Sequence, residues 1–448
     1  MKQMKTRMKT PGKPYFSAGL ASTGGRRDRQ SRERDDHVID TLHAMQLLVV
    51  TLLVAAGSGL GFVDTREVET NRCSDLKSMS MFARGLSCGS PLAQPCFDFG
   101  RCTNTSGIYV YDADCSLADS STMLAANGTA VGQEKGDPHQ IGWVFRNAAR
   151  KAGVLAESYE SACMFMHVTA VGKRVNDEQF HCPIRSPLWN NGNNHVMIDF
   201  GDDGREHRAD VADSFAMDAT SNMHSCLYRS GYDVSLPLAP KKHFHHLAEI
   251  APLDREFRLT FKGTAYLSGH GSEERLSVVP LHNEEHGVVI SVLCFEKHNE
   301  HLLTQNFGYC QSLKHRVYEQ HYNYSTLMNT TFGLVPSGRS PGTYRLAEVM
   351  GAGAIPVIVA RDVVLPFREH IDWPSFSFTF PPDQVGPYMI KQLQAVSRTQ
   401  LEQMQRRSLQ AYRGMFGYDD SLEGPSAFEP IARNLISIML RRIGHRGG

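Results

Sequence analysis

Arginines and glycines cluster in the segment SGRSPGTYRLAE, in the last third of the chain. Arg339 and Arg345 carry guanidinium groups, which match phosphate oxygens in a bidentate fashion. Gly338 and Gly342 have no side chain and would let the backbone approach a ligand closely. Glu348 can accept hydrogen bonds from sugar hydroxyls. Together these residue types predict a site for a sugar nucleotide.

The residues around this segment predict the strand, loop, helix and strand that would position it. A β-prone apolar run at 331–335 predicts a buried strand, and a second such run follows at 354–359. Ser340 is expected to cap the intervening helix, with Pro341 at its first position and Gly351 at its end. The start of such a helix offers free N–H groups and a positive dipole end, which favour a phosphate.

The same residues permit a second interpretation, a structural βαβ unit that binds nothing. Arg345 and Glu348 would then form a surface pair at i, i+3 that contributes about 0.2–0.5 kcal/mol to stability. The residues of this segment alone do not decide between the two interpretations.

Composition sets the broad class of the protein. The chain has 448 residues, enough for two or three domains. It holds 47 basic and 47 acidic residues, and because a general nucleic-acid binder is usually basic, we expect no nucleic-acid partner. Predicted strands alternate with predicted helices in both halves, which indicates α/β domains with parallel sheets.

The amino-terminal region predicts a membrane anchor. Residues 1–43 are polar and basic and are expected to be disordered, and residues 44–63 contain no charged side chain. Twenty helical residues just span a bilayer core of about 30 Å, and the basic flank places the amino terminus in the cytosol. We therefore expect a single-pass type II protein whose bulk is luminal. A cleaved signal peptide, with Met45 as the true start, is the alternative.

Cysteines and glycosylation sequons also indicate a luminal protein. All ten cysteines follow the apolar segment, as expected in an oxidising compartment. Cys96 with Cys102 and Cys294 with Cys310 are candidate disulfide pairs, although sequence cannot fix connectivity. A zinc site near His298 and His301 is the competing interpretation, disfavoured because paired C-x-x-C modules are absent from the sequence. The N-x-S/T sequons that could carry glycans are at Asn104, Asn127, Asn323 and Asn329.

Several segments in one order resemble a known family. They include LVPSGRSPGTYRLAEVMGAGAIPVIV, LPFREHIDW, SPLWNNGNNHVMIDF, FKGTAYLSGHGSEER, NTTFGLVP and CFDFGRC. The chain resembles the exostosin family of glycosyltransferases, glycosyltransferase family 47, from about Cys96 to Gly417. The similarity is greatest to the amino-terminal, glucuronosyltransferase half of the animal heparan-sulfate exostosins.

This resemblance implies a GT-B fold, in which two Rossmann-like domains face a central cleft. The expected organisation is a stem at 64–95, an acceptor domain at 96–250, a donor domain at 251–420 and a C-terminal helix at 421–448. The resemblance implies an inverting transferase in the Golgi or endoplasmic reticulum membrane, which moves a sugar, glucuronate first of all, from a UDP-sugar to a glycan or proteoglycan acceptor. Galactose, xylose or arabinose as donor sugar is one alternative, and a non-catalytic partner subunit is another. An oligomer with itself or with another exostosin-like subunit is also implied.

Sugar transfer requires a clamp for the departing diphosphate and a base for the acceptor hydroxyl. The expected donor-binding residues are Arg275, Gly338, Arg339, Gly342, Arg345 and Glu348, the last of them on the ribose. His195, in a predicted strand, and Asp202, just past its carboxyl end, are the candidate bases.

A divalent metal is the alternative clamp. Asp112 and Asp114 have D-x-D spacing, and Asp202 and Asp203 form a second acidic pair. GT-B enzymes generally act without a metal and the arginines supply charge, so we expect no required cofactor.

The chain departs from the family pattern in two respects. The animal enzymes read PRGRRLGSFRFLE where this chain has PSGRSPGTYRLAE, with fewer arginines, so the donor class is better indicated than the donor sugar. The animal polymerases also carry a second catalytic domain. We do not expect 448 residues to hold it, or to form a complete polymerase.

Overall fold

The computed structural model describes residues 88, 96–103, 106–111, 138–172, 183–201, 214–266, 270–295, 322–417 and 427–444. All of them belong to one compact unit of the chain. The predicted anchor at 44–63 and the predicted stem lie outside the described residues. Among the helices that are described, none is long and apolar enough to span a bilayer.

Two five-stranded sheets form the framework, and every strand pair in both is parallel. The strands of the first sheet are β1 (Ile108–Val110), β2 (Met164–Gly172), β3 (His195–Gly201), β4 (Met217–Thr220) and β5 (Val234–Ser235). Those of the second are β6 (Phe257–Tyr266), β7 (Val288–Phe295), β8 (Thr330–Pro336), β9 (Ile355–Val359) and β10 (Phe378–Phe380). The prediction of two α/β halves with parallel sheets is confirmed.

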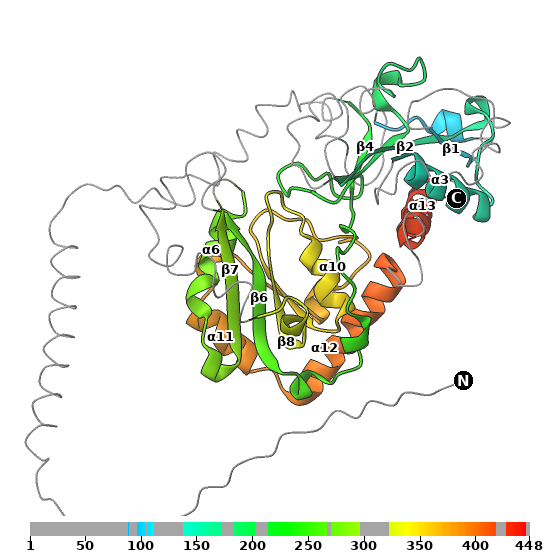
Figure 1. Cartoon of the computed structure of the whole chain (residues 1–448). Coiled ribbons are helices and arrows are strands. Elements are labelled where there is room, and N and C mark those ends of the chain that lie inside the picture. Colours follow the sequence, from blue (N-terminus) through cyan, green and yellow to red (C-terminus); the bar gives the residue numbers. More distant parts are fainter. Residues whose placement is uncertain are drawn as a thin grey trace, which may run out of the picture. The chain divides into compact units, whose positions relative to one another are not determined.

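In the part of the chain that the structure describes, six α-helices accompany the sheets (Figure 1). They are α3 (Pro138–Lys151), α6 (Ser272–Ser277), α10 (Tyr344–Gly351), α11 (Pro387–Gln394), α12 (Arg398–Ala411) and α13 (Glu429–Gly444). Helix α10 packs on β8 and β9, α6 packs on β6, and α3 packs on β1 and β2.

The order of the strands differs between the two sheets in a way that matters for ligand binding. The first sheet runs β1-β2-β3-β4-β5, so each strand lies beside its neighbour in sequence. The second runs β10-β9-β8-β6-β7, so the chain leaves β6 toward one edge and returns to build the other. In open α/β sheets a ligand crevice forms at such a reversal, outside the carboxyl ends of the two strands. The second sheet therefore offers a crevice between β6 and β8.

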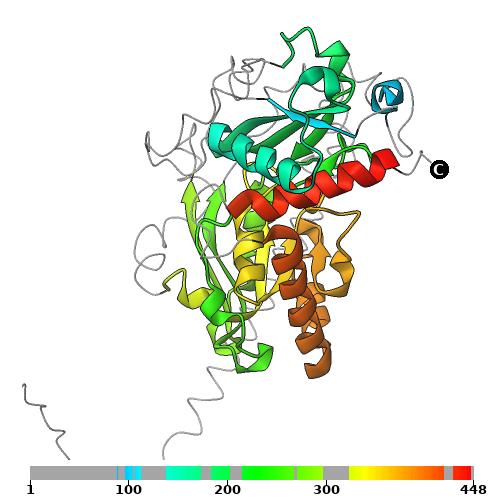
Figure 2. The ribbon, with the colours of Figure 1, turned by 90° about the vertical axis from the view of Figure 1, so that its right-hand side faces the viewer.

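The C-terminal helix returns to the first half of the chain. Figure 2 shows α13 lying beside α3, and Lys151 of α3 forms an ion pair with Glu429 of α13. Arg442 of α13 donates to the carbonyl oxygen of Tyr232 at 2.5 Å and forms an ion pair with Glu369 at 3.1 Å. The helix thus ties segments near the first sheet to the connection between β9 and β10 of the second.

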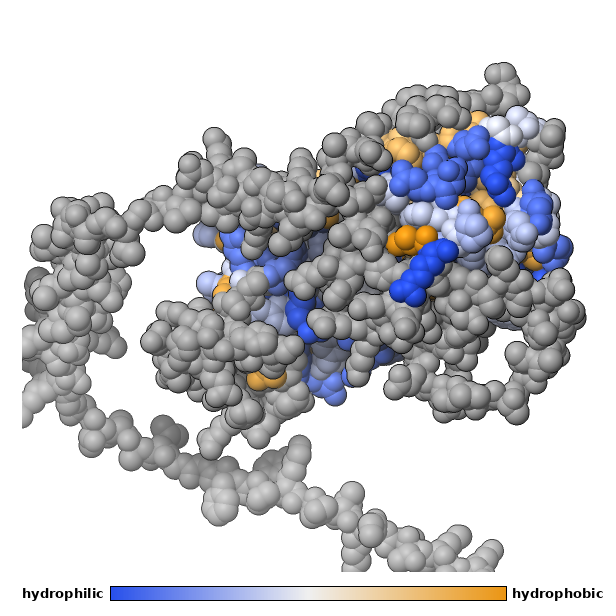
Figure 3. All heavy atoms as spheres, turned by 90° about the horizontal axis from the view of Figure 1, so that it is seen from above, coloured by the Kyte–Doolittle hydropathy of each residue, from blue (hydrophilic) through white to orange (hydrophobic). Residues whose placement is uncertain are grey.

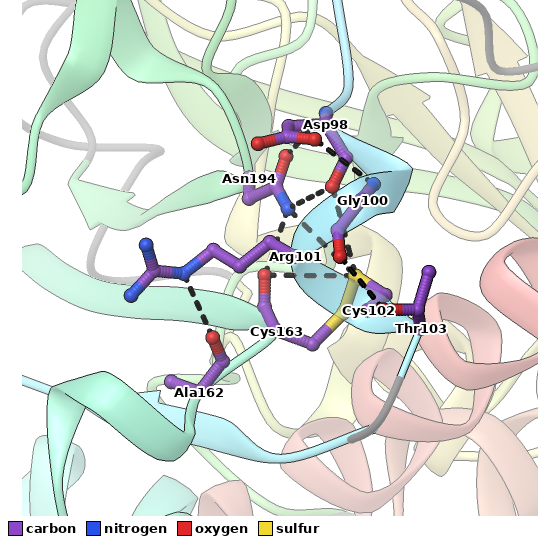
Figure 4. The surroundings of a disulfide bond; sticks show 8 residues. All are labelled: Asp98, Gly100, Arg101, Cys102, Thr103, Ala162, Cys163 and Asn194. Atoms are coloured by element: carbon purple, nitrogen blue, oxygen red, sulfur yellow. Dashed lines mark hydrogen bonds between the residues drawn. A yellow bond between two sulfur atoms is a disulfide. The ribbon is translucent and has the colours of Figure 1, made fainter.

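Two disulfides correct the predicted pairing of Cys96 with Cys102. Cys96 is bonded to Cys88, and Cys102 to Cys163, because the short helix Phe99–Cys102 carries Cys102 onto the start of β2. Figure 4 shows Asn194 holding this junction, with its amide nitrogen donating to Asp98 O at 2.9 Å and to Cys163 O at 2.8 Å.

The other predicted cysteine pair is not tested. Cys294 belongs to β7, and Cys310 lies outside the described residues. Cys226, for which no pairing was predicted, is also disulfide-bonded.

The described surface carries little exposed apolar area. Large apolar side chains are exposed at three described positions, Trp143, Leu253 and Tyr388. On the face shown in Figure 3 the described residues are mostly hydrophilic, and the apolar ones form small separate spots.

Candidate active site

A cavity of about 590 Å³ lies at the reversal of the second sheet. Its walls come from the carboxyl half of β6, the loop after β8, the start of α10 and the segment that links the two sheets. The lining residues include all six predicted donor-binding residues, namely Arg275, Gly338, Arg339, Gly342, Arg345 and Glu348. Residues from two separate segments of the sequence therefore meet in one place.

Arg345 lies on the first turn of α10 and is 5% exposed. Its Nε donates to Leu334 O at 2.7 Å and its Nη2 to Thr260 O at 3.1 Å. The guanidinium carbon lies 5.3 Å from the centre of the Phe261 ring and 5.5 Å from that of Tyr324. Nη1 is buried and has no hydrogen-bond partner among the described residues. Two backbone carbonyls therefore hold the group in place, and its Nη1 is left without a partner in the described part of the chain.

Arg275 lies near the same phenylalanine, with its guanidinium carbon 5.9 Å from the centre of the Phe261 ring. Its Nε donates to Ser337 O at 2.8 Å and its Nη1 to Thr264 O at 2.7 Å, and its guanidinium carbon lies 4.6 Å from the centre of the Tyr266 ring. Burial lowers the pKa of the Arg275 guanidinium, and the charge of Arg345 lowers it further. Arg339 is exposed at the rim of the cavity. Three guanidinium groups therefore converge, as a clamp for an anion requires.

Glu348 is 4% exposed and Arg345 5% exposed, so the alternative of a surface pair is wrong. The carboxylate of Glu348 accepts hydrogen bonds from the backbone N–H groups of Lys241 and Lys242, at 3.1 and 3.2 Å, and from the hydroxyl of Tyr324. Both of its oxygens thus have partners within the chain. The predicted contact of Glu348 with ribose stays a prediction.

Several lining residues escaped prediction from sequence. Lys241 and Lys242 come from the linker, and Lys262 comes from β6, where its ammonium donates to Tyr322 O at 2.5 Å. With these lysines, six cationic side chains and one carboxylate line the cavity. The cationic ones are Lys241, Lys242, Lys262, Arg275, Arg339 and Arg345. Such an excess of positive charge favours a polyanionic ligand.

The loop after β8 does not begin the helix as predicted. Helix α10 starts at Tyr344 with Thr343 at its N-cap, and the Ser340 hydroxyl instead donates to Asn222 Oδ1 at 2.6 Å. A Cβ atom on Gly342 would lie 2.7 Å from Asn222 Oδ1 and would overlap the carbonyl oxygen of Ser221. Ser340 and Gly342 therefore serve the contact between the loop and the segment after β4.

His195 is not placed to act as a base, which corrects that prediction. It lies at the amino end of β3, is 1% exposed, and is not among the residues that line the cavity. Its Nε2 is 3.0 Å from the Tyr111 hydroxyl and its Nδ1 is 2.9 Å from Asn193 O. Burial lowers the pKa of His195 to about 3, so the ring is neutral and structural.

The buried imidazole predicts acid sensitivity. The unfolded chain binds a proton at His195 below pH about 6.5, whereas the folded chain does so only near pH 3, so stability is full above pH 6.5 and falls as pH drops from 6.5 toward 3. Between pH 7 and pH 5 this one group should cost about 2 kcal/mol of unfolding free energy. Urea titrations at both pH values should show a smaller loss in a His195→Gln variant. An equal loss in the variant would contradict the assignment.

The remaining predicted polar sites are only partly described. Asp202 and Asp203 lie outside the described residues, as do Asp112 and Asp114. Gly201, which precedes Asp202, ends β3 and accepts hydrogen bonds from the side chains of Ser221 and Asn222. The second base candidate and both acidic pairs therefore remain predictions.

The described residues contain one group with metal-ligand types. His224, Cys226 and Asp362 have ligand atoms within 4.8 Å of one another. Cys226 is disulfide-bonded and offers no thiolate, and His224 Nε2 already lies 3.6 Å from Asp362 Oδ2. We assign no metal to this group. His298 and His301 of the predicted zinc alternative lie outside the described residues.

The four sequons differ in what the structure describes. Asn104 and Asn127 lie outside the described residues. Asn323 is exposed and lines the cavity, whereas Asn329 is partly buried and its side-chain oxygen is fully enclosed. Glycosylation at each position stays a prediction.

Comparison with known proteins gives one family and several relatives. A family model described as the exostosin GT47 domain matches residues 157–395. Exostosin-1 of Drosophila melanogaster is 28% identical over 338 residues, which cover 70% of this chain and 42% of the relative. The Exostosin-1 homolog of Caenorhabditis elegans is 26% identical over 292 residues, 62% of this chain and 73% of the relative. Exostosin-1 of Bos taurus is 29% identical over 301 residues, 62% of this chain and 37% of the relative. The chain thus spans about two fifths of the length of the fly and bovine proteins.

Solved structures give only a weak likeness. WaaG, a glycosyltransferase of lipopolysaccharide biosynthesis, matches with a TM-score of 0.31 and 10% identity over 72% of this chain and 99% of its own. MurG of Acinetobacter baumannii matches with a TM-score of 0.29 and 13% identity over 61% of this chain and 73% of its own. Likeness at these scores carries no argument, so the assignment depends on the family model. That model covers more than half of the chain and includes β6, β8, the arginine loop and α10. This chain belongs to the exostosin family, glycosyltransferase family 47.

Proposed function

We propose that this protein is an inverting GT-B glycosyltransferase that moves glucuronate from a UDP-sugar to a glycan acceptor. The observation that supports it best is the buried guanidinium of Arg345, which has no ion-pair partner among the described residues and whose Nη1 has no hydrogen-bond partner there. A buried cation without a counter-charge is unfavourable. A nucleotide diphosphate in the cavity would supply the missing negative charge.

The charge of the cavity supports an acidic sugar on the donor. Six cationic side chains face one carboxylate, and a diphosphate carries only about two to three negative charges. The carboxylate of a uronate would use part of the remaining positive potential. A neutral donor such as UDP-galactose, UDP-xylose or UDP-arabinose would leave that potential unused.

In the proposed reaction the acceptor hydroxyl attacks the anomeric carbon and the bond from that carbon to the diphosphate breaks. Arg275, Arg339 and Arg345 would stabilise the charge that grows on the departing UDP. Donors fixed in position by Leu334, Thr260 and Ser337 carbonyls need little reorganisation at that moment. The cavity at the strand ends would shield the sugar from water.

Asp202 is the proposed base that takes the proton of the acceptor. It follows Gly201, whose carbonyl oxygen accepts from the side-chain amide of Asn222, and Asn222 in turn accepts from Ser340 of the arginine loop. The end of β3 is thus two hydrogen bonds away from the donor cavity. This short chain of contacts supports a base on the first sheet and a donor on the second.

The function is tested with the full-length protein in detergent, offered UDP-glucuronate, UDP-galactose, UDP-xylose and UDP-arabinose with glycan acceptors. Release of UDP and formation of product are measured together. We expect the highest rate with UDP-glucuronate. A higher rate with a neutral donor would show that glucuronate is not the preferred donor sugar. If the protein did not bind UDP at all, the assignment of the donor site would be wrong.

A non-catalytic partner subunit is the second candidate. The favouring observation is that the single carboxylate among the described lining residues, Glu348, already accepts three hydrogen bonds within the chain. Such a subunit would bind UDP without turnover. Transfer that appears only when a second exostosin-like subunit is added would favour this candidate.

We expect transfer to persist without a divalent metal. If arginines neutralise the diphosphate, excess EDTA should leave the rate within about twofold of the untreated protein. The rate is measured with EDTA and again after manganese is restored. Complete loss of transfer in EDTA, with recovery in manganese, would instead indicate a metal site at Asp112 and Asp114 or at Asp202 and Asp203.

A single-pass type II anchor at 44–63, in the membrane of the Golgi or the endoplasmic reticulum, completes the proposal, along with a luminal domain that assembles with itself or another exostosin-like subunit. Expressed protein should stay in membranes after carbonate washing and should shift on a gel after glycosidase treatment. Free secretion would favour the cleaved signal peptide instead.

A further inference from the structure

Glu348 connects the central helix of the donor half to the linker between the two sheets. It lies within α10, and its Oε1 accepts the consecutive backbone N–H groups of Lys241 and Lys242. Its Oε2 accepts the hydroxyl of Tyr324. Burial raises the pKa of Tyr324, so this hydroxyl stays protonated and donates. A carboxylate with three such donors is fixed in place.

The two lysines that Glu348 holds by their backbone also reach the cavity with their side chains. The ammonium of Lys241 lies 3.9 Å from the centre of the Tyr344 ring, and that of Lys242 lies 5.6 Å from the centre of the Tyr324 ring. Both lysines line the cavity. Tyr344 begins α10, and Tyr324 is itself bonded to Glu348. One carboxylate thus organises the backbone and one supporting ring of a two-lysine turn.

A carboxylate is unexpected in a cavity that is proposed to bind an anion. By Coulomb's law its negative charge opposes the binding of a diphosphate, the more so because it is buried. Its presence is explained if the cations that it positions favour the anion more than its own charge opposes it. The turn at Lys241 and Lys242 supplies two such cations from a segment that belongs to neither sheet.

We propose that Glu348 is a positioning residue, which acts on an anionic ligand through Lys241 and Lys242 rather than by direct contact with the ribose. This inference builds on the proposed UDP-sugar function. It assigns the linker lysines to the anion subsite, on the diphosphate or on an acidic group of the donor sugar. It also makes the linker between the sheets part of the donor site.

Direct contact and positioning predict opposite results for Glu348→Gln. The glutamine oxygen can still accept both backbone N–H groups, and its nitrogen can donate to the Tyr324 oxygen, so the turn is kept while a negative charge is removed. Positioning therefore predicts UDP affinity equal to wild type or higher. Direct contact predicts a lower affinity, because the carboxylate accepts ribose hydroxyls more strongly than an amide.

The experiment is calorimetric titration of the full-length protein in detergent with two probes, UDP and uridine. For Glu348→Ala we expect UDP affinity to fall about tenfold and uridine affinity to stay unchanged, since uridine has ribose but no phosphate. A Lys241→Ala/Lys242→Ala double variant should show the same pattern. Adding Glu348→Ala to the lysine variant should change UDP affinity by less than about twofold, because Glu348 is proposed to act on UDP only through these two lysines.

Glu249→Ala is the matched control, a carboxylate on the same linker that is exposed and paired with Arg413. It should leave both affinities unchanged. Thermal melts show whether each variant is folded. If Glu348→Ala does not fold, Glu348→Gln and the lysine variant still distinguish positioning from direct contact.

Weaker uridine binding in Glu348→Ala, weaker UDP binding in Glu348→Gln, or additive effects with the lysine variant would each overturn the inference. These outcomes leave wild-type binding of UDP intact. Failure of wild type to bind UDP would instead overturn the proposed function, and the inference with it.

Discussion

Replacing Arg345 by alanine is expected to lower kcat/KM for transfer from the UDP-sugar at least about 100-fold. The Nε and Nη2 atoms of this guanidinium are bonded to backbone carbonyls, and its buried Nη1 has no partner among the described residues. Two carbonyl contacts hold the group in place, so in the proposed reaction its charge would already be oriented when UDP departs. An interaction that strengthens as charge develops lowers the barrier rather than merely improving binding.

Arg275→Ala should have a similar effect, because its guanidinium is fixed by two carbonyls and also lies near the Phe261 ring. The two arginines repel each other while the cavity is empty of anions, and burial already lowers the pKa of Arg275. A bound diphosphate would relieve that repulsion. Neither Arg275→Lys nor Arg345→Lys should restore the rate, since an ammonium lacks the planar fork.

Arg413→Ala is the control for these variants, since Arg413 is exposed and pairs with the exposed Glu249. Steady-state rates with UDP-glucuronate and UDP affinities are compared across the set, with thermal melts to show that each variant is folded. Wild-type rates in folded Arg275→Ala and Arg345→Ala would remove this cavity from the reaction.

The fold was predictable where local pattern decides it. The apolar, β-branched run at Ile355–Val359 can be little other than a buried strand of a parallel sheet, and it forms β9. Strand β4, Met217–Thr220, was missed because four residues with a central aspartate carry too weak a pattern. The order of the strands was also missed, since the reversal between β6 and β8 depends on packing between distant segments.

The residues of the candidate site also differ in whether local sequence predicts them. Arg339, Arg345 and the glycines lie in one continuous segment whose chemistry is local, and the structure gathers them at one cavity. Lys241 and Lys242 lie about a hundred residues earlier and join the cavity through Glu348, a contact that no local pattern reveals. The prediction for His195 was wrong although the sequence already places this residue first in its strand. Ligand crevices lie at the carboxyl ends of parallel strands, so that position argued against a base.

The linker that carries those lysines is anchored further along by Arg255, and here we expect the largest effect on stability. Arg255 is 6% exposed, and burial lowers the pKa of its guanidinium to about 10, so it is still charged at neutral pH. It donates to five backbone carbonyl oxygens at 2.9–3.3 Å and has no carboxylate partner among the described residues. The acceptors are the carbonyls of Leu247, Ile250, Thr330, Ala352 and Gly353.

Arg255→Leu should lower the free energy of unfolding by about 3–5 kcal/mol. Gln405 also donates to Ile250 O at 2.7 Å and to Gly353 O at 3.1 Å, so these two carbonyls keep a partner. The carbonyl oxygen of Leu247 likewise keeps the backbone N–H of Ile250 at 3.1 Å. The carbonyls of Thr330 and Ala352 would lose the guanidinium, at about 1–3 kcal/mol for each one that water does not reach. Urea titration followed through tryptophan fluorescence measures the change, since Trp189 and Trp373 are buried.

Arg413→Leu makes the same chemical change at an exposed ion pair and should cost less than about 1 kcal/mol. Arg255→Lys should fall between the two, since one ammonium has three N–H groups and cannot span five carbonyls. If Arg255→Leu were as stable as Arg413→Leu, the guanidinium would not be what holds the linker to the start of β8 and the end of α10. Because the same linker carries Lys241 and Lys242, a destabilised but folded Arg255→Lys variant should also bind UDP more weakly than wild type.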